Sequence, residues 1–147
     1  GGSYGRQAGF LLFDRERDRM NRLQIVIIDG QGGRMGKAVI EQLKSSYPEL
    51  ELYAIGTNSI ATSAMLKAGA SYGATGENPV IVNARNADLI IGPIGIVMAD
   101  SLMGEITAAM ATAVSSSSAY KILIPVNRCN HFIAGCYMRK VLSIKRE

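Results

Sequence analysis

The sequence predicts an α/β protein in which a mostly parallel sheet of five or six strands lies between two layers of helices. Two observations predict this class. Apolar runs alternate with helical patterns from residue 23 to residue 126, which is typical of strand–helix–strand construction. The first run, LQIVIID, is apolar over most of its length, as expected of a parallel strand covered on both faces. A chain of 147 residues suggests one domain.

The expected elements follow one another in a regular order. A strand at residues 23–29 leads into a helix at 33–47, in which Met35, Val39 and Leu43 share one face. A second strand (50–56) leads into a second helix (59–69) that Gly69 ends. The remaining expectations are a short third strand at 80–83, a fourth at 87–93, a helix at 100–114, a fifth strand at 120–126 and a sixth at 131–138. This order is that of a single-domain, Rossmann-like three-layer sandwich.

Composition and charge argue against several classes of protein. With 48% hydrophobic and 19% charged residues, the chain is expected to be globular rather than disordered. No apolar run approaches the roughly 18 residues of a membrane span, so no membrane partner is expected. The formal charge of +4 comes from residues 1–19 and 139–147, because residues 22–138 hold eight basic and eight acidic side chains. Nucleic acid is therefore not an expected partner.

Met20 stands directly before the first strand, where a domain of this kind would begin. We therefore expect residues 1–19 to be an upstream extension, native or added by cloning, residues 20–138 to be a Rossmann-like nucleotide-binding domain, and residues 139–147 to be a basic tail. The apolar patch AGFLLF is too short for the core of a signal peptide. A cytoplasmic location is the default expectation, with Cys129 and Cys136 reduced.

The loop after the first strand, DGQGGRMG, carries the main functional signal. Gly30, Gly33 and Gly36 form G-x-x-G-x-x-G between a strand and a helix, which is the context of a phosphate-cradling turn. Glycines permit close approach, and the first N–H groups of the helix face the anion. The alternative is a turn that only holds the helix close to the strand. A Walker-type loop does not fit, because Gln31 stands at its first glycine and Ala38 replaces its hydroxyl.

Ligands of parallel sheets bind at the carboxyl ends of the strands, where five unusual loops are expected to converge. These loops are DGQGGRMG, GTNS, NARN, GPIGIVMADS and NRCNH. The predicted ligand contacts are Gly30, Gln31, Gly32, Gly33, Arg34, Met35, Gly36, Thr57, Asn58, Ser59, Gly92, Pro93, Gly95 and Asn127. The expected ligand is a nucleotide or another small phosphate-bearing molecule.

The segment after the second strand bears on which nucleotide is bound. A domain that prefers NAD usually has an acid about 20 residues beyond the glycines, on the ribose hydroxyls. Thr57, Asn58 and Ser59 stand there instead, and no carboxylate in that segment would repel a 2′-phosphate. This favours NADP or a related nucleotide as the cofactor. The same residues are good helix N-caps without any ligand, and both interpretations stay open.

No catalytic set stands out among the acids. Asp29, at the end of the first strand, could bind a metal or a ribose hydroxyl, although a hydrogen bond within the turn is the favoured role. Asp100 is equally well explained as the N-cap of a helix beginning near Ser101. The acids that could act in acid–base chemistry are Glu77, Asp88, Asp100 and Glu105. Whether the protein is an enzyme is left open.

The segment NRCNHFIAGC carries the only histidine and both cysteines. Cys129, His131 and Cys136 lack a common zinc spacing and an evident fourth ligand, so no metal site is predicted. Cys129 acting as a nucleophile with His131 as its base is an alternative. The favoured interpretation is a ligand edge or subunit contact lined by Asn127, Arg128, Asn130 and His131.

Two resemblances can be stated on these segments. GQGGRMG resembles the nucleotide loop of dihydrodipicolinate reductases, which implies NAD(P)H binding. That family's catalytic His-His segment and substrate domain have no counterpart here. From about Met20 to Gly135, the chain is similar to a small bacterial family known only as a domain of unknown function. The segments that carry this likeness are IDGQGG, GTNSIATSAMLKAGA, ATGENPVIVN, ADLIIGPIGIV, GEIT and ILIPVNRCNH.

Two classes of function remain open at this point. One is a non-catalytic oligomeric sensor or interaction module, and the other is a small NAD(P)-dependent oxidoreductase. A homo-oligomer is expected in either case, because seven methionines and long apolar helix faces offer more apolar surface than one sheet covers.

Overall fold

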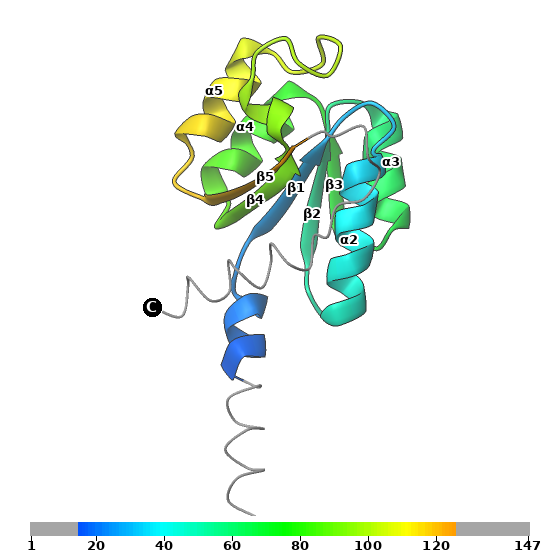
Figure 1. Ribbon diagram of the computed structural model, residues 1–147. Helices are drawn as coiled ribbons and strands as arrows, with labels where there is room; N and C mark the ends of the chain where they lie inside the picture. The colour runs from blue at the N-terminus through cyan, green and yellow to red at the C-terminus, as the bar shows by residue number, and fades with distance from the viewer. Residues whose placement is uncertain (1–14, 126–147) are drawn as a thin grey trace, which may run out of the picture.

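Residues 15–125 are described by a computed structural model, in which five strands form one all-parallel sheet (Figure 1). The strand order is β3-β2-β1-β4-β5. The elements are β1 (Ile25–Asp29), α2 (Arg34–Ser46), β2 (Leu52–Gly56), α3 (Ser59–Lys67), β3 (Tyr72–Thr75), α4 (Glu77–Asn86), β4 (Leu89–Pro93), the 3₁₀ helix η1 (Ile94–Val97), α5 (Ala108–Ser116) and β5 (Tyr120–Ile124). This architecture confirms the predicted α/β, Rossmann-like class.

The central strand β1 explains the three layers. All five of its residues are buried, and successive side chains point to opposite faces. Ile25 and Ile27 join the core under α2 and α3, whereas Val26 and Ile28 join the core under α4 and α5. The two helix pairs accordingly lie on opposite sides of the sheet (Figure 1). Each fully buried side chain of this size contributes about 1.5–3 kcal/mol of hydrophobic stabilisation.

The strand order places a topological switch point beside β1. The chain builds β1, β2 and β3 outward on one side and then returns to place β4 and β5 on the other. Ile25 of β1 therefore pairs with both Leu52 of β2 and Leu89 of β4. The loops after β1 and β4 diverge at the carboxyl edge, which is where open α/β sheets bind ligands.

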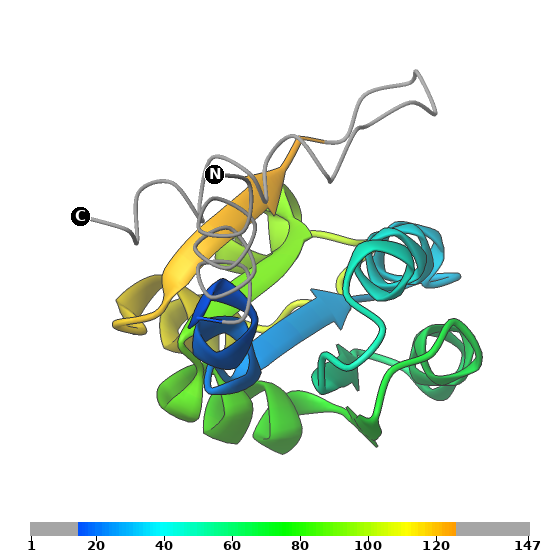
Figure 2. The same ribbon diagram turned by 90° about the horizontal axis from the view of Figure 1, so that it is seen from below.

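A short helix over residues 15–21 precedes β1 and lies beyond the amino ends of the strands. Figure 2, which views the molecule from that end, shows it in front of the sheet. Its Met20 is buried in the core that includes Ile25 and Leu50, and Arg17 pairs with Glu49. The division at residues 19 and 138 stays a prediction, and the expected sixth strand lies outside the described residues.

The predicted third strand at residues 80–83 is wrong. Those residues lie inside α4, where Val80 and Ala84 face the core at helical spacing and Val82 is exposed. Pro79 is tolerated because it stands in the first turn, where its missing N–H has no helical partner. The third strand is Tyr72–Thr75, a mostly exposed edge strand without the apolar run that marks a buried one.

The predicted helix at residues 100–114 begins too early, because α5 starts at Ala108. The backbone is left-handed at four residues of the segment before it, namely Asp100, Leu102, Met103 and Gly104. Asp100 is therefore no helix cap, and Thr107 takes that role by accepting a 3.1 Å hydrogen bond from the N–H of Met110. None of the described helices is long and apolar enough to cross a membrane.

Candidate functional site

The loop between β1 and α2 turns sharply at the carboxyl edge of the sheet. Gln31 and Gly33 have left-handed backbones, with φ of 50° and 71°, and the N–H of Gly33 donates to the carbonyl of Gly30 at 2.9 Å. This turn lifts Gln31 and Gly32 into solvent and starts α2 at Arg34. Within residues 15–125, the backbone N–H groups of Gly32 and Arg34 have no hydrogen-bond acceptor.

Asp29 lies beneath this loop and binds it from inside. Its side chain is buried, and its two carboxylate oxygens accept hydrogen bonds from the N–H groups of Gly30 (2.8 Å) and Gly36 (2.7 Å). Burial raises the pKa of Asp29, while the hydrogen bonds from Gly36 and Gly30 oppose that rise. The structure confirms the turn hydrogen bond as the role of Asp29. Among the described residues, no cluster of metal-ligating side chains includes it.

Two of the three motif glycines are required by packing. A Cβ atom at Gly33 would lie 2.8 Å from the Cα of Ala61, and one at Gly36 would collide with the Met65 side chain. At both positions the missing side chain of the glycine lets α3 approach the start of α2 closely. Gly33 and Gly36 therefore have a packing role against α3, whereas the predicted alternative was a turn that only holds the helix close to the strand. Ligand binding by this loop stays a prediction. Gly32 differs, because a Cβ there would meet only Arg34 Cγ, at 4.0 Å.

Glu105 reaches this loop from the segment between η1 and α5. Its Oε2 accepts hydrogen bonds from the N–H of Gln31 and the hydroxyl of Thr57, both at 2.7 Å, and its Oε1 accepts one from Asn58 Nδ2 at 3.0 Å. Burial acts to raise the pKa of Glu105, but these three hydrogen bonds outweigh it and hold the pKa below its usual value. The carboxylate also fills the space that a Cβ at Gly30 would need.

The polar side chains of Thr57 and Asn58, which follow β2, form hydrogen bonds within the protein. Asn58 caps α3, because its Oδ1 accepts a 2.9 Å hydrogen bond from the N–H of Ala61, and its Nδ2 also donates to the carbonyl of Gln31 at 2.9 Å. Ser59 is exposed at the start of α3. The N-cap interpretation is thus confirmed for Asn58. The preference for NADP loses its premise, since the Glu105 carboxylate stands beside Thr57 and Asn58.

The predicted contacts at the end of β4 lie on the same edge and are closely packed. A Cβ at Gly92 would collide with the carbonyl of Ile28 on β1, and Gly95 is buried in η1, where its carbonyl accepts from the Ser101 hydroxyl. Pro93 ends β4 and is the N-cap position of η1. These residues shape the rim of the switch point. Their positions agree with the predicted edge, although neither glycine offers an open backbone.

The five expected loops do not all converge. The segment NARN ends α4, and the neighbouring Asp88 accepts a 2.8 Å hydrogen bond from the N–H of Gln24, which precedes β1. Both therefore lie at the amino edge, and including this segment in the site was wrong because residues 77–86 are helical. Glu77, the first residue of α4 after β3, accepts a 2.6 Å hydrogen bond from the Thr107 hydroxyl. Asn127, Cys129, His131 and Cys136 lie outside the described residues.

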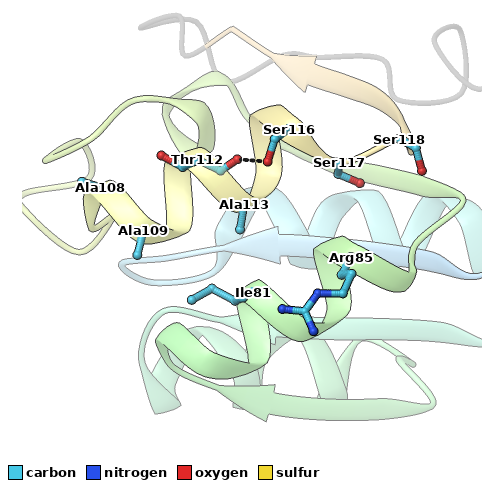
Figure 3. Close-up of a pocket in the computed structure, with 9 residues that line it drawn as sticks. All are labelled: Ile81, Arg85, Ala108, Ala109, Thr112, Ala113, Ser116, Ser117 and Ser118. Atoms are coloured by element: carbon cyan, nitrogen blue, oxygen red, sulfur yellow. Dashed lines mark hydrogen bonds between the residues drawn. The ribbon is translucent and has the colours of Figure 1, made fainter.

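A groove of about 730 Å³ lies away from this edge, between α4 and α5 (Figure 3). Ile81 and Arg85 line it from α4, and small side chains line it from α5. The Thr112 carbonyl accepts from the Ser116 hydroxyl along its wall. The remaining lining residues are Ala108, Ala109, Thr112, Ala113, Ser116, Ser117 and Ser118. The groove shares no residue with the predicted ligand contacts.

Comparison with known proteins identifies the family but no activity. No curated protein matches the chain. Among solved structures, the chain is similar to a dodecameric FMN-dependent Ubix-like decarboxylase from Escherichia coli O157:H7, with 17% identity, a TM-score of 0.46, and coverage of 84% of this chain and 75% of that one. A likeness at this level says nothing about a ligand here. The model of a domain of unknown function, DUF3842, matches residues 24–145. The protein belongs to the DUF3842 family.

Proposed function

We propose that the protein binds a nucleotide or another phosphate-bearing ligand at the carboxyl edge of the sheet, over the loop between β1 and α2. The observation that carries the proposal is the hydrogen bond from the N–H of Gln31 to the carboxylate of Glu105, a residue 74 positions away in the chain. This loop geometry accommodates an oxyanion. The N–H groups of Gly32 and Arg34 supply further donors at the same turn, beside the start of α2.

Charge at the loop supports the same conclusion. Arg34 and Lys37 are exposed in the first turn of α2. Their side chains add positive charge where the helix dipole already favours an anion. The proposed contacts are those predicted from the sequence: Gly30, Gln31, Gly32, Gly33, Arg34, Met35, Gly36, Thr57, Asn58, Ser59, Gly92, Pro93, Gly95 and Asn127. Of these, the exposed Gln31, Gly32 and Arg34 are the ones we expect to touch the phosphate directly.

The Glu105 carboxylate beside Thr57 and Asn58 bears on which nucleotide is bound. NADP was favoured by the sequence because Thr57, Asn58 and Ser59 include no acid. Glu105 now supplies a carboxylate at that position in space, which would repel a 2′-phosphate. This carboxylate removes the reason to prefer NADP and favours NAD for the adenosine side of the edge.

A binding module is favoured over an oxidoreductase by the state of the acids at this edge. Asp29 holds two backbone N–H groups, and Glu105 holds three donors. An acid engaged in this way is a poor proton donor or acceptor for a substrate, since chemistry requires a titratable group with a free position. The proposed role is a nucleotide-dependent sensor or interaction module.

We also expect self-association. Ile60 and Leu66 of α3 and Tyr72 of the edge strand β3 are 69%, 41% and 50% exposed, and a Cβ at Gly73 would touch Leu66. Exposed apolar side chains on α3 and on the edge strand β3 are suited to burial against a second copy. Sedimentation velocity at micromolar concentration tests this, and a monomer throughout would contradict it.

The binding proposal is tested with a matched pair of variants at Gly32, where an added side chain has room. Gly32→Asp places a carboxylate beside the proposed phosphate, and Gly32→Asn places a neutral side chain of the same shape there. Isothermal titration with NAD, NADP and ATP should show binding to the wild type and to Gly32→Asn, with affinity at least about tenfold lower in Gly32→Asp. Equal affinities in the two variants would place the ligand elsewhere.

Native mass spectrometry of freshly purified protein provides an independent measurement. A retained mass that matches a nucleotide and disappears on denaturation would identify the ligand directly. The same spectrum reports the number of subunits. An absence of both an adduct and any response to the three nucleotides in titration would reject the proposed function.

A further inference from the structure

Three donors at the carboxyl edge converge on a single point. They are the backbone N–H of Gln31, the hydroxyl of Thr57 and the side-chain amide of Asn58, and all three donate to the carboxylate of Glu105 at 2.7–3.0 Å. They come from the ends of two adjacent parallel strands, β1 and β2. A group of donors from separate elements, directed at one oxyanion, is the arrangement that also binds a phosphate through its oxygens.

The same donors cannot serve Glu105 and a ligand at once. A backbone N–H has one hydrogen, and Oε2 of Glu105 already accepts it from Gln31. Oε2 also occupies the space above Gly30, next to Thr57 Oγ1. A phosphate at this point would meet a carboxylate of like charge in contact distance, which strongly opposes simultaneous occupancy.

The segment that carries Glu105 is fixed at its base. The N–H of Ile106 donates to the carbonyl of Ser101 at 3.2 Å, and the N–H of Asp100 donates to the carbonyl of Ile106 at 2.7 Å. Ile106 is fully buried, and the Ser101 hydroxyl donates to the carbonyl of Gly95. These contacts hold residues 101 and 106 together and leave residues 102–105 as the tip of a small loop.

The tip has an unusual backbone and is exposed at Met103 and Gly104, whereas Leu102 and Glu105 are half-buried. Leu102 and Met103 have φ of 53° and 58°, a conformation that side chains other than glycine rarely adopt. Met103 is 92% exposed, so hydrophobic burial does not explain its position. Strained backbone persists where other contacts over-determine it. At this tip the side-chain hydrogen bonds of Glu105 act together with two 3.1 Å backbone hydrogen bonds, from the N–H of Gly104 to the carbonyl of Ser101 and from the N–H of Glu105 to the carbonyl of Leu102. Leu102 also packs against the core under α4 and α5.

We infer that residues 101–106 form a latch in which Glu105 occupies the phosphate position, and that ligand binding requires the tip, residues 102–105, to release it. The inference rests on the proposed function and adds a subsite and its regulation. The subsite takes a phosphate monoester or inorganic phosphate on Gln31, Thr57 and Asn58. Release breaks the three hydrogen bonds to the Glu105 carboxylate, while the buried Ile106 keeps the base of the latch in place.

Phosphate titration followed by the amide NMR signal of Gln31 tests this inference, with inorganic phosphate as the probe. Glu105→Gln removes the charge from the latch, and Asp100→Asn removes an equal charge from an exposed position before it. The half-saturating phosphate concentration should fall by about tenfold or more in Glu105→Gln, the range expected when a hydrogen bond to a charged group no longer competes. It should change by less than about twofold in Asp100→Asn, where only general charge is altered.

Glu105→Asp gives a second measurement that keeps the charge. Its side chain is shorter by one methylene group and does not span the three donors, so it should also bind phosphate more tightly than the wild type. Dispersed amide spectra for each variant confirm that the fold is retained. If Glu105→Gln fails to fold, Glu105→Asp against wild type decides the question.

Each other result overturns the latch in a distinct way. Equal phosphate affinity in the wild type and Glu105→Gln would leave the binding site in place and remove the latch. Weaker binding in Glu105→Gln would show that Glu105 supports the ligand instead of competing with it. If the Gln31 signal responds to phosphate in no variant and NAD and NADP also fail to bind, the proposed function itself fails, and the latch with it.

Discussion

The carboxylate of Asp29 accepts a 2.7 Å hydrogen bond from the backbone N–H of Gly36, which ties the last residue of β1 to the first turn of α2. With the bond from Gly30, it fixes a buried carboxyl group at a helix N-terminus. Helix N-termini favour negative charge. Asp29 therefore accepts hydrogen bonds from N–H groups on the core side of the loop, and a ligand would accept them from N–H groups on the solvent side.

Replacing Asp29 should lower the free energy of unfolding more than replacing Asp88, an exposed acid that also accepts a backbone hydrogen bond. In Asp29→Asn, only one oxygen remains for the N–H groups of Gly30 and Gly36, and the new amide N–H₂ faces a donor. We expect a loss of about 1–3 kcal/mol in the free energy of unfolding, measured with urea. Asp88→Asn, which alters a single exposed bond to Gln24, should cost less than about 1 kcal/mol. Equal losses would contradict the role of Asp29.

The glycines of the first loop should separate into a packing glycine and a free one. Gly33→Ala places a methyl group against the backbone of Ala61 at φ 71°, so we expect at least about 2 kcal/mol of destabilisation. Gly32→Ala has open space and should change stability by less than about 0.5 kcal/mol. Thermal and urea unfolding measure both. A tolerant Gly33 would show that α2 and α3 are less closely packed than described.

The stability contributed by Glu105 should depend on pH with a defined sign. Its pKa in the folded state is lowered from 4.5, so ionised Glu105 stabilises the fold above pH 4.5, and this stabilisation is lost as pH falls through the folded pKa. The difference in unfolding free energy between the wild type and Glu105→Gln should therefore shrink from about pH 6 to about pH 3. A constant difference would contradict the hydrogen bonds of Glu105.

Asp29 should show the opposite pH dependence. Burial raises its pKa above 3.8, so the ionised form is the less favourable one in the folded state. Its contribution is greatest below pH 3.8 and declines as pH rises through the folded pKa. The wild type should lose stability relative to Asp29→Asn over that rise. Urea unfolding of the two proteins across the same pH range measures the slope, and a slope of the same sign as that of Glu105 would contradict it.

Thr107 should stabilise the start of α5. Thr107→Ala removes the acceptor for the N–H of Met110 and the donor to Glu77, and N-cap losses of this kind cost about 1 kcal/mol. Thr112→Ala, at an exposed position inside the same helix, should be neutral or slightly stabilising because alanine favours helices. Circular dichroism during urea unfolding compares the two. Similar losses would show that helix content, and not the cap, determines the result.

The sequence predicted those elements whose local pattern matches their burial. β1 is apolar because both of its faces are covered, and α2 has apolar residues on one face and Lys44 in its last turn. β3 could not be found in this way, because an exposed edge strand of four residues carries no apolar run. Its neighbour α4 contains Val80, Ile81 and Val82, whose β-branched side chains favour a strand until packing against α5 decides otherwise.

The candidate site shows the same division between local and distant information. The glycine loop and the cap at Asn58 depend on neighbours in the chain and were recognised from them. The position of Glu105 depends on a contact across 74 residues and on left-handed residues that favour no turn by their chemistry, Leu102 and Met103. Within the sequence, Gly104 and the capping residue Thr107 were the available signals that no helix runs through this segment.

The position of β1 in the sheet has a consequence for the order of folding. β1 can pair with β2 as soon as residue 56 is available, but its other edge has no partner until β4, which begins at Leu89. During synthesis, a chain that ends before β4 would lack β4, β5 and α5. One edge of β1 would be unpaired, and Val26 and Ile28 would be incompletely covered on their face of the sheet. Such non-local pairing slows folding and exposes strand edges to other chains. Truncation between β3 and β4 should therefore produce an aggregating fragment, whereas extension through β5 closes both edges of β1.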